Sequence, residues 1–330
     1  MKLAQILSVF LCVFVMTSCS QCVPTSTQPQ GMETYATSAT GIDIPDAMIE
    51  YADDPMVQWM AGIVVGIENA EMIQGISQES FEVYSNPGDK INAVILVQNG
   101  LDKTQRFDLM VFADGVPVEF STNGEIYNSY SIDLTPWQKM IEIEFEKDFT
   151  LNMGRLDFVM SYSENPHEDF HLVTYTVWVD LANEPLQPAK LCSVVNQRVG
   201  VEGMYGGGAY NAWFWNGGAS PSETEGLGPR TISFRDNETV LLEAIASQPG
   251  YYRTVVVVNG KPMHFDIDGV NHAYIDWESK GTNMLQMPIT LSEIPSSGYI
   301  YTVTTPLTTE NRSQFVVASG MIELVPDTEE

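Results

Sequence analysis

The sequence predicts an all-β protein that carries two β-sandwich modules in tandem. Short alternating runs rich in Val, Ile, Phe, Tyr and Thr recur between turn signals from Phe81 onward, which is typical of antiparallel sheets. One hairpin pattern then returns further along the chain, which indicates an internal repeat. Because 330 residues exceed what one hydrophobic core usually serves, two modules are the expected organisation.

The first residues predict export from the cytoplasm. Lys2 supplies a positive charge, and the stretch from Leu3 to Met16 is almost entirely apolar. This is the pattern of a signal peptide, and the apolar stretch is too short to cross a bilayer. Residues 1–18 are therefore expected to be a signal peptide.

The end of this leader carries a lipidation pattern. Met16-Thr17-Ser18-Cys19 resembles the lipobox of bacterial lipoproteins, although that family usually has leucine where this chain has Met16. The resemblance implies that a lipid on Cys19 anchors the chain to a bacterial membrane on its extracytoplasmic side. The alternative is cleavage by an ordinary signal peptidase at the small-x-small site Ser18-Cys19-Ser20, which would release a secreted, soluble protein.

Acidic side chains dominate the charge of the chain. It has 15 basic and 43 acidic residues, for a net charge of -28. Such a surface repels nucleic acid, so the expected partners are the membrane through the lipid anchor and an unknown envelope protein or surface ligand. Hydrophobic residues make up 44% of the chain, which is enough to bury cores.

Two cysteines lie outside the apolar leader and the proposed anchor. Cys22 and Cys192 could form one disulfide in an oxidising envelope, but the sequence does not fix the distance between them. The alternative is a free or separately modified Cys22 and a partly buried Cys192.

The region before the first module divides into two parts. Residues 19–41 are mainly Thr, Ser, Gln, Pro, Ala and Gly, which predicts a flexible, lipid-anchored tether. Residues 42–78 form an N-terminal extension in which the spacing of apolar residues favours a short amphipathic helix followed by a strand.

The first module is expected over residues 79–182. Its size and the spacing of its strands resemble an immunoglobulin-like or fibronectin type III-like module, which implies an antiparallel β-sandwich. The segments predicted to be strands are Lys90 to Gln98, Arg106 to Ala113, Val116 to Phe120, Ser129 to Leu134, Met140 to Phe145, Arg155 to Ser163 and Leu172 to Asp180.

A repeated hairpin places the second module over residues 229–325. The segment 111–120 matches 256–265, an offset of 145 residues (256 minus 111). Asp114-Gly115 and Asn259-Gly260 both favour a two-residue type I′ turn. Pro117 and Pro262 follow these turns and have no N–H to donate, so each returning strand is expected at a sheet edge.

Residues 183–228 form an inter-module segment rich in glycine and aromatic side chains. A plain linker would not usually carry Trp213, Phe214 and Trp215. These three residues either pack between the modules or lie on a loop that contacts a ligand, and they are the favoured binding residues because large aromatics often anchor interfaces.

The pentad from His167 to His171, His-Glu-Asp-Phe-His, resembles the H-E-x-x-H pattern of zinc metalloproteases. The resemblance implies that both histidines bind one zinc ion while Glu168 acts as general base, which requires a helix. Here the pentad continues directly into a strand-like run, and residues four apart in a strand stand about 13 Å from each other. A solvated hairpin is expected, and a loose surface zinc site is the alternative.

Asp266-Ile267-Asp268-Gly269 resembles the start of a calcium loop. No glutamate follows at the distance that an EF-hand requires, so a turn with solvated carboxylates is expected. No metal or other cofactor is predicted.

The sequence thus predicts a non-catalytic lipoprotein of the cell envelope whose tandem immunoglobulin-like domains act as a binding or accessory module. One alternative is a zinc-dependent hydrolase that uses His167, Glu168 and His171. The other is a structural spacer without a specific ligand.

Overall fold

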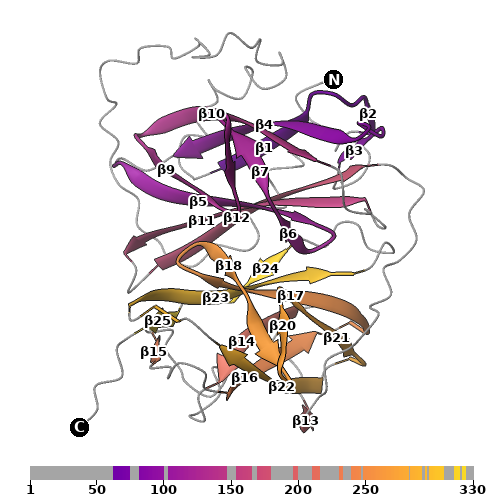
Figure 1. Ribbon diagram of the computed structural model, residues 1–330, viewed down its shortest axis with the longest axis vertical. Helices are drawn as coiled ribbons and strands as arrows, with labels where there is room; N and C mark the ends of the chain where they lie inside the picture. The colour runs from indigo at the N-terminus through magenta and orange to yellow at the C-terminus, as the bar shows by residue number, and fades with distance from the viewer. Residues whose placement is uncertain are drawn as a thin grey trace, which may run out of the picture.

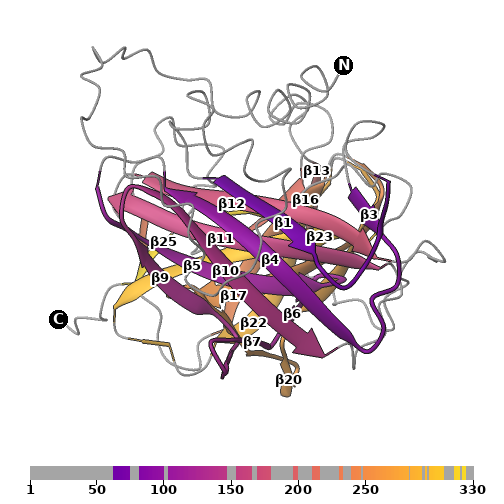
Figure 2. The same ribbon diagram turned by 90° about the horizontal axis from the view of Figure 1, so that it is seen from above.

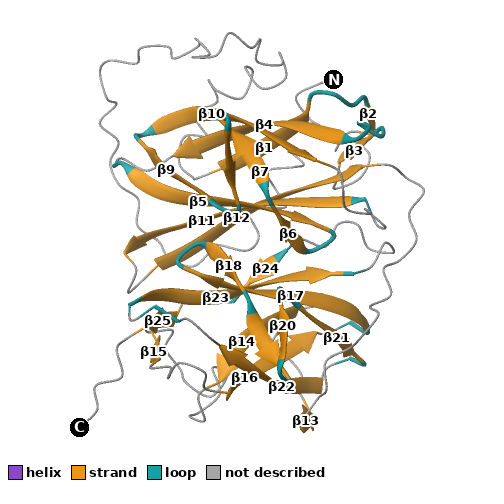
Figure 3. Ribbon diagram, in the orientation of Figure 1, coloured by secondary structure: helices purple, strands orange, loops and turns teal. Residues whose placement is uncertain are grey.

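Every regular element in the part of the chain that the computed structural model describes is a β-strand (Figure 3). The all-β class predicted from the sequence is therefore confirmed. The described residues are 62–74, 82–99, 103–146, 154–165, 169–179, 196–199, 210–215, 230–232, 239–246, 248–281, 283–291, 294–295, 297–307, 316–319 and 322–324.

The first sandwich consists of two sheets, A and B. Sheet A contains β1 (Gly62–Ile67), β4 (Lys90–Asn99), β7 (Phe120–Thr122), β8 (Glu125–Tyr127) and β10 (Trp137–Glu146), in the order β1-β4-β10-β7-β8. Sheet B contains β2 (Met72–Gln74), β3 (Glu82–Tyr84), β5 (Gln105–Ala113), β6 (Val116–Val118), β9 (Tyr130–Leu134), β11 (Arg155–Asn165) and β12 (Asp169–Val179). Its order is β2-β3-β12-β11-β5-β6, and β9 also pairs with β5.

The second sandwich consists of sheets C and D. Sheet C contains β13 (Asn196–Val199), β14 (Tyr210–Trp215), β16 (Thr239–Ala246), β19 (Phe265–Ile267), β20 (Val270–His272) and β22 (Asn283–Leu291), in the order β14-β16-β22-β19-β20, with β13 beside β22. Sheet D contains β15 (Arg230–Ile232), β17 (Gly250–Val258), β18 (Lys261–Met263), β21 (Ile275–Ser279), β23 (Gly298–Pro306), β24 (Val317–Ala318) and β25 (Ile322–Leu324). Its order is β15-β25-β23-β17-β18, with β21 beside β17 and β24 beside β23.

The two sandwiches share one topology. The five strands of sheet A match five strands of sheet C in order, from β1 and β14 at one edge to β8 and β20 at the other, and β13 is an addition to sheet C. In sheets B and D, the parallel pair β3 and β12 corresponds to the parallel pair β15 and β25. The pairing of β5 with β9 returns in β17 and β21 at an offset of 145 residues, since Gln105 opposite Leu134 corresponds to Gly250 opposite Ser279.

Alternation along each strand decides which side chains enter a core, because successive residues point to opposite faces of a sheet. In β4, the side chains that enter the core between sheets A and B are Ile91, Ala93, Ile95 and Val97. In β16, those that enter the core between sheets C and D are Val240, Leu242, Ala244 and Ala246.

A third core lies between the two sandwiches, where sheet B faces sheet D. It contains Met110, Phe112 and Val159 from sheet B and Val255, Val257, Tyr301 and Val303 from sheet D, together with Val316. Strands β5 and β17 are buried on both faces, since their alternate residues enter the core of their own sandwich and this third core. The sheets therefore stack along the long axis of the molecule in the order A, B, D, C, and Figure 2 shows the same stack from above (Figures 1 and 2).

The predicted hairpins have the expected geometry. Asp114 and Gly115 have φ angles of 48° and 75°, and Asn259 and Gly260 have 49° and 73°, which suits two-residue type I′ turns. The strands that follow, β6 and β18, each lie at the edge of their sheet, as the prolines within them require.

The sheets extend beyond the predicted module boundaries at residues 79 and 229. The extension predicted over 42–78 contributes β1, which pairs with β4, and β2, which pairs with β3. The segment predicted over 183–228 contributes β13 and β14, which pair with β22 and β16. In β1 the alternating pattern buries Ile63, Val65 and Ile67, so these residues belong to the core of the first sandwich and not to a segment outside it. Residues 19–41, Cys22 and Cys192 lie outside the described residues.

Candidate functional site

The zinc-protease pattern is described only in its second half. His167 and Glu168 lie outside the described residues, whereas Asp169 and His171 belong to β12. Asp169 pairs with Asn165, and His171 pairs with Tyr162 of β11. The described part of the pattern is therefore extended strand, in the position where a zinc protease would need a helix.

The pattern that resembles a calcium loop forms a β-hairpin. Asp266 lies in β19 opposite Asn271, and Asp268 begins the turn to β20 with a φ angle of 53°, followed by Gly269 at 78°. The neighbouring His264 contacts Asn271 through Nδ1 and Oδ1 at 2.9 Å. The turn itself accounts for the Asp-Gly pair, since both residues adopt positive φ angles.

The aromatic segment is an edge strand of sheet C. In β14, Trp213 lies opposite Glu243, Phe214 opposite Leu242, and Trp215 opposite Leu241. Leu242 enters the core of the second sandwich, whereas Leu241 and Glu243 are not part of that core. The structure thus brings the three predicted binding residues into the outermost layer of the stack, away from the core between the sandwiches.

Next to this strand lies a buried polar pair that the sequence did not reveal. Gln286 donates a hydrogen bond from Nε2 to Oε1 of Glu243 at 2.6 Å, and both side chains are buried. The only sequence signal was the single acid in the apolar run Val240 to Ala246.

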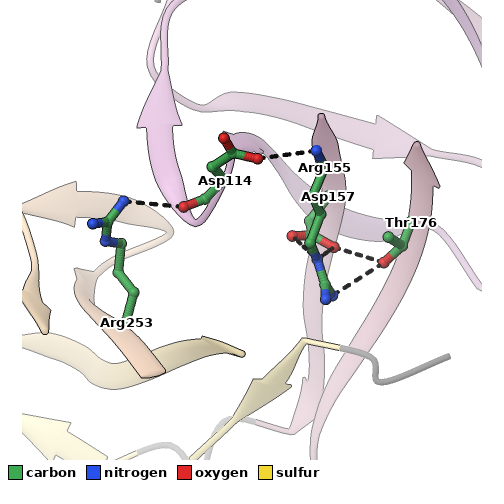
Figure 4. A network of polar contacts seen from close by, with 5 residues as sticks. All are labelled: Asp114, Arg155, Asp157, Thr176 and Arg253. Atoms are coloured by element: carbon green, nitrogen blue, oxygen red, sulfur yellow. Dashed lines mark hydrogen bonds and ion pairs between the residues drawn. The ribbon is translucent and has the colours of Figure 1, made fainter. Parts of the chain in front are cut away.

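A polar network connects the two sandwiches (Figure 4). In β11, Arg155 Nε donates to both carboxylate oxygens of Asp157 at 2.9 and 2.8 Å, and the Thr176 hydroxyl donates to Asp157 Oδ1 at 2.6 Å. The main-chain N–H of Arg155 donates to Asp114 Oδ1 at 2.9 Å. The carbonyl oxygen of Asp114 accepts a hydrogen bond from Arg253 Nη1 of the second sandwich at 3.0 Å.

Arg253 also forms a fork with a buried carboxylate in its own sandwich. Its Nε and Nη2 donate to Oδ1 and Oδ2 of Asp276 at 2.7 and 2.8 Å. The guanidinium lies 3.8 Å from the ring centroid of Tyr274, and that of Arg155 lies 5.7 Å from the ring of Trp178. Bidentate pairing and the close aromatic ring hold Arg253 in one geometry, whereas Arg155 shares its single Nε–H between the two oxygens of Asp157.

This network favours a structural role. Arg155 and Asp157 have no exposed surface, and Arg253 and Asp276 are almost completely buried, so neither ion pair offers a surface on which a ligand could bind. Arginine stays protonated in proteins and does not serve as a base. The network can therefore fix the turn at Asp114-Gly115 of the first sandwich against Arg253 of the second sandwich.

A further carboxyl, that of the half-buried Glu82, lies in β3 opposite Val177, the residue after Thr176 of β12. Tyr84 donates a hydrogen bond from its hydroxyl to Glu82 Oε2 at 2.9 Å. Burial raises the pKa of Glu82, although hydrogen bonds from Tyr84 and Tyr175 lower it. Burial also raises the pKa of Tyr84, which Glu82 raises further by charge repulsion. The neutral forms of both groups are thus favoured.

Neither a metal cage nor a membrane span is found in the described residues. In the ranges given above, no three His, Cys, Asp or Glu side chains converge closely enough to hold a metal ion. Over the same part of the chain, no helix has both the length and the apolar character to cross a bilayer.

Comparison with known proteins gives no family. No protein-family profile and no curated protein matches the chain. Among solved structures, the FixG-related protein from Vibrio parahaemolyticus is similar at 15% identity and a TM-score of 0.23, over 37% of this chain and 97% of that one. A transglutaminase from red sea bream is similar at 5% identity and a TM-score of 0.23, over 82% of this chain and 31% of that one.

Proposed function

We propose that this protein is an extracytoplasmic lipoprotein, anchored to a bacterial membrane through Cys19, whose two immunoglobulin-like sandwiches act as a non-catalytic binding module for an envelope protein or surface ligand. The observation that supports it best is the continuous stack of four layers. The core between sheets B and D joins the sandwiches, so the outer sheets A and C lie at opposite ends of one body.

The two ends of this body differ, which indicates which end faces the membrane. The chain from Cys19 enters the stack at β1, an edge strand of sheet A. The predicted tether, residues 19–41, would separate the lipid on Cys19 from the stack. Sheet C, with the aromatic strand β14, forms the other end. A protein tethered at sheet A would place β14, the edge strand of sheet C, away from its anchor.

The lipid anchor is tested by metabolic labelling with a radioactive fatty acid in a bacterial host. The full chain should incorporate the label, Cys19→Ala should lose it, and Cys22→Ala should keep it. Unlabelled protein in the medium, cleaved after Ser20, would instead support release by an ordinary signal peptidase. Label that survives in Cys19→Ala but not in Cys22→Ala would move the anchor to Cys22.

The binding end is tested by replacing single residues of the full chain with a photo-crosslinking amino acid. Probes at Trp213 and Trp215 should give a crosslinked product of one defined mass in intact cells. A matched probe at Glu125, an exposed position on the β8 hairpin of sheet A, should not. Crosslinking from Glu125 but not from β14 would place the contact at the wrong end and overturn the proposal.

The same stack also favours a structural spacer, since a rigid four-layer body can hold two envelope components at a fixed separation. The triple alanine variant of Trp213, Phe214 and Trp215 separates the two functions when the photo-crosslinking probe is placed at Asn211 of β14, in both this variant and the otherwise natural chain. A binding module should lose its crosslinked product while it keeps its melting temperature. A spacer should show no specific product in either form.

A further inference from the structure

The faces that the two sandwiches present to each other are built from equivalent residues. Met110 and Val255, and Phe112 and Val257, are related by the offset of 145 residues, and all four enter the core between sheets B and D. Val159 and Val303 occupy matching places on β11 and β23, opposite Met110 and Val255. Each sandwich therefore uses the same patch of its surface, which is the definition of an isologous interface.

The first hairpin turn touches the second sandwich. A Cβ atom on Gly115 would lie 3.0 Å from Cβ of Thr305 and 3.2 Å from Cδ of Arg253. The carbonyl of the preceding Asp114 accepts the hydrogen bond from Arg253. The absence of a side chain on Gly115 lets this turn approach the other sheet.

The second hairpin turn touches the first sandwich in the corresponding place. A Cβ atom on Gly260 would lie 2.5 to 2.8 Å from the carboxylate and Cβ atoms of Asp108. Gly260 is the repeat equivalent of Gly115, and Asp108 is the equivalent of Arg253, both at the offset of 145 residues. Gly115 therefore contacts Arg253 of the second sandwich, and Gly260 contacts the equivalent residue of the first sandwich, Asp108.

We infer that the two sandwiches form an isologous pair, equivalent to a symmetric dimer contained in one chain. The turns Asp114-Gly115 and Asn259-Gly260, called the latches below, each contact the other sandwich and hold the pair together. The partner of each face is the other repeat. The chain therefore moves as one body, and neither inner face is open to an external ligand. This inference does not depend on the proposed function.

Type I′ geometry alone does not explain the close contacts. The second hairpin of each sandwich has the same kind of turn, with Gly124 at a φ angle of 81° and Gly269 at 78°. No described heavy atom beyond their own chain neighbours lies within 4 Å of a Cβ atom on either glycine. These two positions carry the same backbone strain without the contact between sandwiches, so they are matched controls.

The test compares Gly115→Ala and Gly260→Ala with Gly124→Ala and Gly269→Ala in the full mature chain. All four variants should lose stability through the positive φ angle. The latch variants should melt lower than the controls by roughly 5 °C and, in small-angle scattering, show a larger radius of gyration, because overpacking separates the sandwiches. Equal melting and equal radii in both pairs would overturn the inference.

A second-site variant keeps the test decisive if Gly260→Ala folds poorly. Adding Asp108→Ala removes the two carboxylate atoms nearest to the new methyl group, although Cβ of residue 108 stays. The double variant should recover part of the lost melting temperature and compactness. Because the two residues belong to different sandwiches, recovery of the melting temperature shows that they are in contact. The inference is refuted if the double variant does not recover and Gly115→Ala melts at the same temperature as the control variants.

Discussion

Arg253 of the second sandwich donates a hydrogen bond from Nη1 to the main-chain carbonyl oxygen of Asp114 of the first sandwich, at 3.0 Å. The same guanidinium holds the buried carboxylate of Asp276 with its other nitrogens. One side chain therefore couples an ion pair inside one sandwich to the orientation of the other.

Removing Arg253 should cost much more than an exposed ion pair would. Arg253→Met leaves the Asp276 carboxylate buried without its charged partner, so we expect a loss of about 3 to 5 kcal/mol in the free energy of unfolding, measured in urea. The double variant Arg253→Met/Asp276→Leu should recover most of this loss, since no buried charge remains. A double variant as unstable as the single one would show that packing, and not the uncompensated charge, dominates.

Phe112 provides a direct measure of the core between the sandwiches. Its side chain has no exposed surface, yet it lies on the face of sheet B that is turned away from the core of the first sandwich and towards sheet D. Phe112→Ala should lower the free energy of unfolding by about 3 to 5 kcal/mol if the sandwiches stay joined in solution. Ile126→Ala, at a side chain that is 71% exposed, should change it by less than about 0.5 kcal/mol. A small effect at Phe112 would mean that the sandwiches separate.

Local turn chemistry could be predicted from the sequence because it depends on two adjacent residues. Asp114-Gly115 and Asn259-Gly260 require positive φ angles wherever they occur in a hairpin, and the prolines that follow them can only occupy an edge. The same signal at Asp268-Gly269 predicts a turn, and the structure shows one there, between β19 and β20, equivalent to the turn at Asn123-Gly124 between β7 and β8.

The contacts between distant residues could not be predicted in this way. Arg253 meets Asp276 because β17 and β21 pair in one register, and a shift of one residue would send these side chains to opposite faces. The core between sheets B and D could not be predicted for a related reason. The match between 111–120 and 256–265 predicts a hairpin there, but the burial of β17 on both faces depends on a second sandwich that the pattern of one strand does not identify.

Glu82 should make stability depend on pH in the acidic range. Burial raises its pKa above the ordinary value, so its contribution to stability is fully present below the unfolded pKa and is lost as pH rises through the folded pKa. Glu82→Gln removes this titration and keeps an acceptor for the Tyr84 hydroxyl. The variant should therefore gain stability relative to the natural chain between about pH 4 and pH 7, in denaturation curves collected across that range.

The exposed Glu71, in the loop before β2, supplies the matched variant Glu71→Gln, which also replaces one carboxylate by an amide. It shows how much of the effect in the denaturation curves comes from the loss of one surface charge. If Glu82→Gln follows the natural chain at every pH, then the Glu82 carboxyl is solvated in solution and the prediction is wrong.

Tyr301 should govern part of the response to alkaline pH. Its buried hydroxyl donates a hydrogen bond across the interface to Ser161 Oγ at 3.0 Å, and burial raises the pKa of the phenol. Its contribution to stability is therefore complete below the unfolded pKa, about 10, and is lost as pH rises above that value. Tyr301→Phe should lose about 1 kcal/mol at pH 7, since one hydrogen bond is removed, and should decline less steeply above pH 10.

Tyr252→Phe distinguishes the interface from burial in general. Burial raises the pKa of Tyr252 to about 12, but its hydroxyl donates to the carbonyl oxygen of Gln248 within the same sandwich, at 3.0 Å. Both variants should flatten the alkaline decline in the free energy of unfolding. The double variant Tyr301→Phe/Ser161→Ala should lose less stability than the sum of its two single variants, because both changes remove the same hydrogen bond between the sandwiches, whereas Tyr252→Phe/Ser161→Ala should lose the full sum. Additive losses in both double variants would show that the Tyr301 hydroxyl does not reach Ser161 in solution.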